Sequence, residues 1–206
     1  MKNIQKIILL LLFTCLVSPI SIAQKLIYPE DEWEAIQPNE IDLDADKIQH
    51  LFDLSFVDPA TQGVTLIKDG YLVGERYADN YDEKSYGTSW SMAKSFYAAL
   101  IGISIDLGEI DSLDDKVSKY LSYYNDERKN ITIRQILNMT SGLEFPENEH
   151  ESMFFRYDQA KYAREIGLEK KPEQVFEYNN VNSMIIGEIL KSVTGKNADI
   201  LLEERI

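Results

Sequence analysis

A serine and a lysine three positions apart, Ser91 and Lys94, are the first candidates for chemistry in this chain. They stand where the polar turn 87–91 runs into a stretch that is almost entirely apolar. Residues three apart on a helix lie on the same side, so an amine would stand beside a hydroxyl. This spacing predicts a nucleophile with a neighbouring base. The alternative is an N-cap serine and a solvated lysine, and Ser89 could equally be the cap.

The composition favours a folded protein and excludes several functions. The chain has 206 residues, of which 44% are hydrophobic and 27% charged, which is enough for one domain with a core. Its net charge of -14 argues against binding nucleic acid, whose phosphates need a basic surface. The histidines, His50 and His150, have no partner at the spacing of a zinc site. We therefore expect no metal and no cofactor.

Residues 1–23 have the pattern of a signal peptide. Two lysines precede the apolar run 7–17, and small residues at 21–23 stand where signal peptidase cuts. The run is shorter than the roughly 20 residues of a spanning helix, which disfavours a membrane anchor. Cys15 lacks the small residues of a lipidation box before it, which disfavours a lipoprotein. We expect export to the periplasm or medium, which would remove two lysines, no acids and the only cysteine, and so give a net charge of -16.

The segment before the apolar stretch predicts one helix and a hairpin. Residues 25–40 read as an irregular lead-in. A helix capped by the acidic run 42–46 follows, and Asp58-Pro59 ends it. The runs 63–67 and 71–77 favour strands, and Asp-Gly between them is a strong hairpin signal. The expected apolar face of the helix consists of Ile48, Leu51, Phe52 and Leu54.

About five helices are expected after the two strands. The first carries Ser91 and Lys94, runs to Leu107 and, being apolar on all sides, should be buried in a core. The others are expected over 111–121, from a Thr132 capping box to Met139, over 184–193 before Gly195, and at the C-terminal end. The charged and aromatic region 144–171 has no clear pattern, and a helix around 157–166 is our interpretation of it. Two strands do not make a stable sheet. Either the domain is helical with a hairpin attached, or strands that complete the sheet are missing from this sequence.

Four segments, in order and spacing, resemble those of the β-lactamase-related serine hydrolases, which include class C β-lactamases and penicillin-binding-protein-like enzymes. They are Ser91-x-x-Lys94, 108–121, 131–143 and Tyr178-x-Asn180. Met139 before Thr-Ser-Gly resembles the aminohexanoate-dimer hydrolase branch. The resemblance covers about residues 40–206. It implies an α/β protein of the α+β type with a β-lactamase/transpeptidase-like fold, an antiparallel sheet flanked by helices plus a helical subdomain.

The resemblance also implies a mechanism. Ser91 would attack the carbonyl of an amide, ester, β-lactam or D-amino-acid peptide, and water would hydrolyse the acyl-enzyme. Lys94 or Tyr178 would take the serine proton, and Tyr178 would have the larger role in protonating the leaving group. Asn180 would hold the network and the substrate amide. The alternative is a relative that binds cell-wall peptides or other ligands without turnover. A protein that only binds does not need Ser91, Lys94 and Tyr178, so the presence of all three favours the enzyme.

One element of that family is not found. Its third motif, Lys-Thr-Gly or His-x-Gly on a strand, would supply one of two oxyanion-hole donors, and Thr194-Gly195 instead ends a predicted helix. We therefore expect 24–206 to be the N-terminal part of a single β-lactamase-related domain whose C-terminal strands are missing. Expressed alone, this part should fold poorly and be inactive. The partner would be a small molecule or a peptide, and the oligomeric state stays open.

Overall fold

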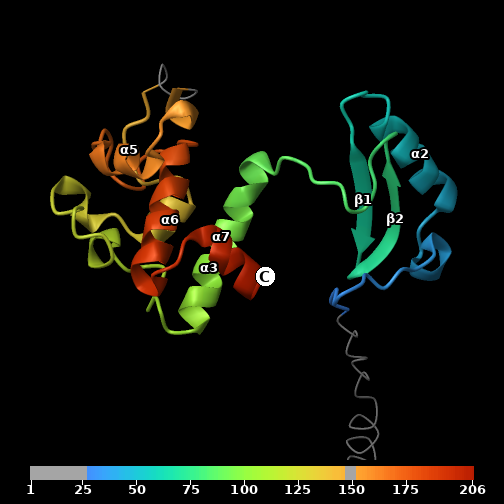
Figure 1. Cartoon of the computed structure of the whole chain (residues 1–206), viewed down its shortest axis with the longest axis horizontal. Helices are drawn as coiled ribbons and strands as arrows, with labels where there is room; N and C mark the ends of the chain where they lie inside the picture. The colour runs from blue at the N-terminus through green and yellow to red at the C-terminus, as the bar shows by residue number, and fades with distance from the viewer. Residues whose placement is uncertain (1–26, 147–151) are drawn as a thin grey trace, which may run out of the picture. The chain divides into compact units, whose positions relative to one another are not determined.

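The computed structural model describes residues 27–146 and 152–206, and the chain divides into two compact units between Gly87 and Thr88 (Figure 1). The predicted signal peptide, Cys15 and His150 lie outside the described residues. Within those residues, no helix has the length and apolar character needed to cross a membrane. Each unit is described by itself.

The first unit is a hairpin with one helix. Strands β1 (Gly63–Lys68) and β2 (Tyr71–Tyr77) pair antiparallel, from Gly63 opposite Tyr77 to Lys68 opposite Tyr71, with a bulge between Leu66 and Ile67. The turn uses Asp69 at φ 54° and Gly70 at φ 86°, and two left-handed residues are what a tight type I′ hairpin requires. The predicted hairpin is confirmed.

The helix α2 (Ala45–Ser55) begins at Asp44, whose carboxylate accepts hydrogen bonds from the amides of Asp46 and Lys47. Phe52 is its buried residue, and its ring lies over Gly74 in β2, where an added Cβ would come within 3.1 Å of it. The predicted apolar face is too wide: Ile48 is half-buried, but Leu51 and Leu54 are 40% and 59% exposed. A two-stranded hairpin is narrow, so within this unit it covers only the stripe at Ile48 and Phe52.

The lead-in is more regular than predicted. Residue Ala35 forms a parallel bridge with Leu72, made by hydrogen bonds of 3.0 Å between the backbones of Leu72, Glu34 and Ile36. A 3-10 turn, η1 (Pro38–Ile41), follows. These bonds occupy the free edge of β2, so the segment extends the hairpin by one short pairing.

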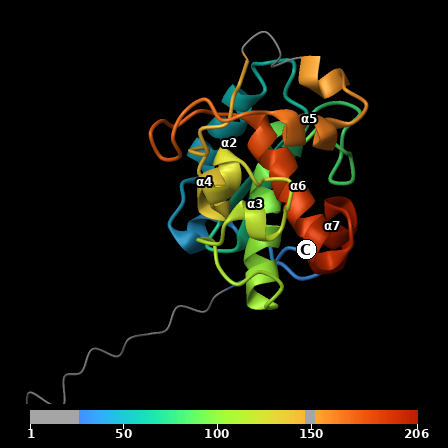
Figure 2. The same ribbon diagram turned by 90° about the vertical axis from the view of Figure 1, so that its left-hand side faces the viewer.

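The second unit is helical, as predicted. Its helix α6 lies beside α3 in both views of the ribbon (Figures 1 and 2) and also packs against α4 and α5. In order, the elements are η2 (Trp90–Met92), α3 (Ala93–Asp106), η3 (Val117–Lys119), η4 (Glu127–Asn130), α4 (Ile133–Leu137), η6 (Ser152–Phe155), α5 (Gln159–Glu165), α6 (Asn180–Thr194) and α7 (Ala198–Arg205). A two-stranded antiparallel sheet followed by these helices confirms the α+β class.

The core of this unit is built around α6. Seven of its fifteen residues are buried, among them Ile185, Ile186 and Ile189. They pack with apolar residues from α3, α4 and α7, all of which are less than 3% exposed: Leu100, Ile101, Ile133, Ile136 and Leu201. Gly195 at φ 73° ends the helix in the left-handed conformation that glycine adopts without strain. The element that carries Asn180 is therefore anchored along its length.

Within the second unit taken by itself, the central helix is not buried on all faces, contrary to the prediction for it. In α3, Leu100, Ile101 and Ser104 are buried, whereas Phe96 is 37% exposed. The helix packs against α6 and α7 on one side. Among the described residues of the second unit, α6 and α7 are its main helix partners, so the apolar sequence is not matched by burial on every side within this unit.

The predicted helix over 111–121 is also wrong. Only the 3-10 turn η3 forms there. The reason lies in the backbone: Val117 N donates to Ile131 O at 2.8 Å and Ile133 N donates to Asp115 O at 3.0 Å. These groups are used between two segments and are not available for a helix. The capping box of Thr132 and Gln135 does open α4, as predicted.

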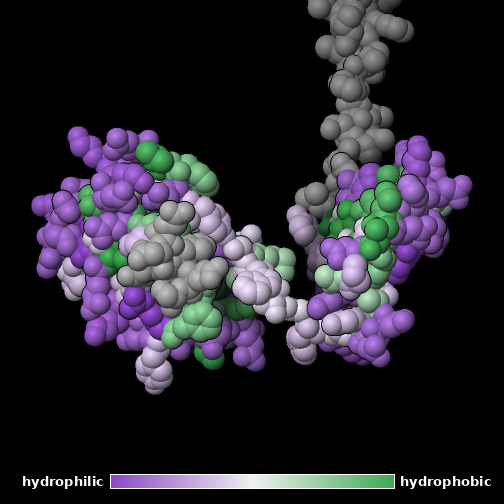
Figure 3. Space-filling model, turned by 90° about the horizontal axis from the view of Figure 1, so that it is seen from above, coloured by the Kyte–Doolittle hydropathy of each residue, from purple (hydrophilic) through white to green (hydrophobic). Residues whose placement is uncertain are grey.

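The surfaces of both units are largely hydrophilic on the face that Figure 3 shows. On the face shown in Figure 3, hydrophilic residues cover much of each unit and hydrophobic residues form separate patches.

An ion pair connects the C-terminal helix to the end of α3. Arg205 of α7 donates to Glu109 at 2.7 Å and to the Ser104 hydroxyl at 3.0 Å. This contact fixes the C-terminal helix to the end of α3.

Candidate active site

The candidate nucleophile lies in a distorted turn. Ser91 is the middle residue of η2, directly before α3, and it is exposed. The preceding residue, Trp90, has φ 43°, a left-handed value that is unusual for a bulky side chain. Strained backbone of this kind is found often at functional sites. The turn presents the Ser91 hydroxyl at the start of a helix, where the first N–H groups have no partner within the helix.

Two side chains converge on the Ser91 hydroxyl. Lys94 Nζ donates to Ser91 Oγ at 3.1 Å from one turn along the same helix. Tyr178 reaches the same atom from a distant part of the chain, with its hydroxyl 2.5 Å from Ser91 Oγ. Lys94 Nζ also lies 4.8 Å from the centre of the Tyr178 ring. The structure thus brings these three predicted residues together in one hydrogen-bonded cluster.

The cluster favours the ionised form of the tyrosine. The Lys94 ammonium beside its hydroxyl, and then the hydrogen bond with Ser91, lower the pKa of Tyr178 below its ordinary value of 10.0. A neutral Tyr178 donates to Ser91 Oγ, whereas a phenolate accepts the proton of Ser91. At 2.5 Å the two oxygens are close enough for that transfer without a change of position.

Tyr178 is held in place by its chain neighbours. Glu177 N donates to Met139 O at 2.9 Å, and its carboxylate binds Lys170 at 2.8 Å. On the other side, Asn179 is 1% exposed and caps α6 by accepting from Val181 N. Its amide also donates to the carbonyl oxygens of residues 143 and 144, at 3.3 and 3.1 Å. The tyrosine is therefore fixed by both flanking residues even though the residue itself is 43% exposed.

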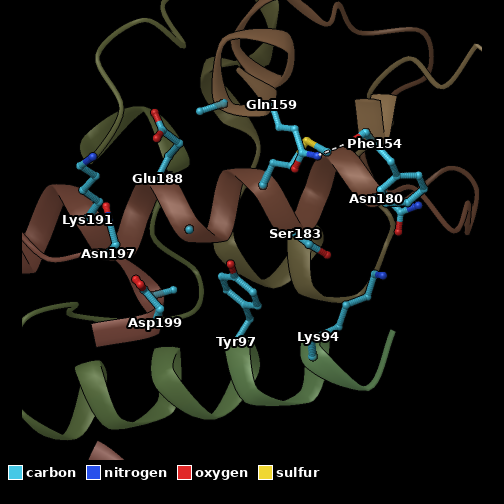
Figure 4. A pocket seen from close by; sticks show the side chains of 15 residues that line it. Lys94, Tyr97, Phe154, Gln159, Asn180, Ser183, Glu188, Lys191, Asn197 and Asp199 are labelled. Atoms are coloured by element: carbon cyan, nitrogen blue, oxygen red, sulfur yellow. Dashed lines mark hydrogen bonds between the residues drawn. The ribbon is translucent and has the colours of Figure 1, made fainter. Parts of the chain in front are cut away.

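Asn180 lies near the cluster but is not one of its hydrogen-bonded members. It is the first residue of α6, is 8% exposed, and lines a groove of about 650 Å³ together with Lys94. Figure 4 shows the side chains of Asn180 and Lys94 at one end of this groove, with Glu188 and Asp199 farther along it. A substrate amide placed at that end would meet both groups.

The sequence pattern does not identify Asn179 as a site residue. It points to Met139 only through the resemblance to the aminohexanoate-dimer hydrolase branch. An asparagine before an apolar helix is a capping signal, so Asn179 could have been found from its position. Met139 has φ 58° and uses its carbonyl to hold the residue before Tyr178. No pattern in the local sequence predicts that contact.

The two-stranded sheet and the helices that follow it belong to a β-lactamase/transpeptidase-like fold. The β-lactamase family model matches residues 56–206, and the chain belongs to this family. Protein flp of Staphylococcus aureus (strain COL) is 29% identical over 143 residues, which cover 64% of this chain and 28% of flp.

Solved structures share the fold. A 6-aminohexanoate-dimer hydrolase homologue from Bacillus anthracis aligns with a TM-score of 0.67 and 21% identity, over 88% of this chain and 54% of the other. A D-stereospecific amidohydrolase from Streptomyces aligns with a TM-score of 0.61 and 24% identity, over 79% and 53%. The chain therefore spans about half of these proteins and 28% of flp. At these identities the likeness to the two structures concerns the fold alone.

Proposed function

We propose that this chain carries the catalytic residues of a serine hydrolase that works through an acyl-enzyme on Ser91. The observation that carries the proposal is the convergence of Lys94 Nζ and the Tyr178 hydroxyl on Ser91 Oγ, at 3.1 and 2.5 Å. A serine hydroxyl is a weak nucleophile until a base takes its proton. Here two groups that can accept a proton lie within reach of it.

The reaction would proceed by proton exchange within this cluster. Ser91 Oγ forms a bond to the substrate carbonyl carbon while its proton passes to Tyr178 or Lys94. The protonated group then returns that proton to the leaving amine or alcohol as the old bond breaks. Water attacks the acyl-enzyme in the same way and releases the acid, which restores Ser91.

The Lys94 ammonium supports the tyrosine as base. A positive charge beside Tyr178 stabilises the phenolate, which is the direction of its pKa. In that arrangement Lys94 keeps its charge and Tyr178 moves the proton. The backbone N–H of Ser91, at the start of the helix, would be one donor to the oxyanion.

The substrate would be an amide, an ester, a β-lactam or a D-amino-acid peptide. Support for an amide comes from Asn180 beside Lys94 in the groove, because its side-chain amide can pair with a peptide group.

We also propose that residues 1–23 direct export. N-terminal sequencing of the secreted protein would test this, because cleavage after residue 23 would leave Gln24 as the first residue.

The test uses the protein expressed from its complete reading frame. It is incubated with a fluorescent penicillin and, separately, with a fluorescent fluorophosphonate. Wild type should be labelled by at least the fluorophosphonate, Ser91→Ala should not, and Ser95→Ala, which changes an exposed serine on the same helix, should label as wild type does. Absence of labelling by both probes would reject the hydrolase in favour of a binding protein.

A further inference from the structure

A groove leads away from the serine cluster between helices α3 and α6 (Figure 4). Its volume of about 650 Å³ lies within the usual range of ligand-binding pockets. Lys94 and Asn180 line one end of it, and Lys94 donates to the Ser91 hydroxyl, so the groove begins at the candidate nucleophile. A substrate whose carbonyl lies at Ser91 can therefore extend into this groove.

Helix α6 turns one face to the core and another face to the groove. The residues that line the groove recur at intervals of three and four positions, which places them on one stripe of the helix. This stripe rises about 16 Å along the helix axis, at about 1.5 Å per residue. That length matches about five residues of extended peptide. The members of the stripe are Asn180, Ser183, Met184, Gly187, Glu188 and Lys191.

The walls of the groove offer groups that can pair with a peptide backbone. Ser183 lines it from α6, and the Tyr97 hydroxyl points toward α6 from α3 (Figure 4). Burial, and then the nearby Asp199 carboxylate, raise the pKa of Tyr97, so its hydroxyl stays protonated and can donate to a carbonyl. Between these polar groups stand Gly187 and Ala160, whose small size leaves room for a main chain.

Asp199 gives the groove a negative charge beyond the serine cluster. Glu188 also lines the groove, but its carboxylate accepts from Arg164 Nε at 2.9 Å. Asp199 is exposed and has no ion pair among the residues that the structure describes. An acid in the first turn of α7 also suits the helix dipole, yet this one lines the groove as well. The Lys191 amine points away from Asp199 in Figure 4, so a cation in the groove would meet the carboxylate.

We propose that this groove binds a linear peptide of about four or five residues in extended form, with a basic side chain of that peptide at Asp199. One end of the peptide is the bond that Ser91 attacks, and this part of the inference rests on the proposed function. A small ring such as a β-lactam would occupy only the end with Lys94 and Asn180. The groove therefore favours a peptide over a compact substrate.

Gly187 offers a way to close the groove without a change in the serine cluster. An added Cβ there would lie 3.5 Å from Tyr97 Cε1, an ordinary contact distance, so a leucine would fill the space between α6 and the tyrosine. Ala160→Leu fills the same groove from α5 and replaces the first variant if that one does not fold. Gly102→Leu is the matched control, because Gly102 on α3 is exposed and an added Cβ would have nothing within 4 Å.

The test is calorimetric titration of the protein from its complete reading frame, with Ser91→Ala so that no ligand is consumed. The ligands, acetylated and amidated, are dialanine and pentaalanine with one lysine at each position in turn, in all-L and in all-D form. The best pentapeptide should bind about tenfold tighter than dialanine, the effect of one or two added hydrogen bonds. Gly187→Leu and Ala160→Leu should remove this advantage, whereas Gly102→Leu should keep it.

The charge is tested with the same pentapeptide. Asp199→Asn should weaken its binding about two- to fivefold at low salt, the effect of an exposed ion pair. Glu203→Gln, which changes an exposed acid on the same helix outside the groove, should not weaken it. Pentapeptides that bind no tighter than dialanine in both series, or that bind equally well to Asp199→Asn, would overturn the proposal.

Fluorophosphonate labelling of the protein with Ser91 intact separates this inference from the proposed function. Absence of labelling, with the dependence on peptide length and charge still present, would reject the hydrolase and retain the peptide groove. Labelling of Ser91 without that dependence would do the reverse.

Discussion

Replacement of Tyr178 by phenylalanine removes the hydroxyl that lies 2.5 Å from Ser91 Oγ and leaves the ring in place. General acid–base catalysis contributes about 10²–10⁴-fold to a rate. Lys94 Nζ would still lie 3.1 Å from the serine and could take part of that role. We therefore expect the lower end of the range, a loss of about 100-fold in the rate of Ser91 acylation.

The assay is the second-order rate of fluorophosphonate labelling, measured on the protein from its complete reading frame. Tyr157→Phe is the matched control, because that tyrosine is fully exposed and its change should leave the rate unaltered. Lys94→Met should also reduce the rate. If Tyr178→Phe labels as fast as wild type while Lys94→Met does not label, the lysine is the base and our reasoning on the phenolate is wrong.

Three further outcomes follow from the fold. Gly142→Ala should lower the free energy of unfolding by at least about 1 kcal/mol, since φ is 74° and the new Cβ would lie 2.1 Å from Lys170 O; an unchanged thermal melt would contradict this. Asn179→Ala should cost about 1–2 kcal/mol in urea unfolding, through loss of the α6 cap. Arg205 lowers the pKa of Glu109 below its ordinary value of 4.5, so this ion pair stabilises the folded state above that pH and the stabilisation is lost on acidification. Glu109→Gln should therefore make the melting temperature less dependent on pH in this acidic range.

Local signals in the sequence predicted the elements whose structure depends on near neighbours. The Asp69-Gly70 turn, the Asp44 cap and the Thr132 capping box each use a side chain or a left-handed residue within three positions. The spacing of Ser91 and Lys94 belongs to the same group, since one helical turn brings them together. Short-range geometry of this kind can be read without the rest of the chain.

Contacts between distant segments could not be predicted in this way. Residues 111–121 have a helical pattern, but Val117 pairs with Ile131. The central stretch is apolar on all sides, yet α3 buries one side in its own unit. Asn182 looks like any polar residue in a helix until Met139 is placed beside it. The role of Tyr178 beside Ser91 was expected from family resemblance, because no local rule joins residues 87 positions apart.

The central claim is that Ser91 becomes acylated, and the mass of one peptide tests it most directly. Trypsin should release residues 85–94, which contain Ser85, Ser89 and Ser91, from protein treated with a fluorophosphonate. We expect one adduct on this peptide, placed on Ser91 by fragmentation and absent from Ser91→Ala. An unmodified peptide, or an adduct on another serine that persists in Ser91→Ala, would contradict it.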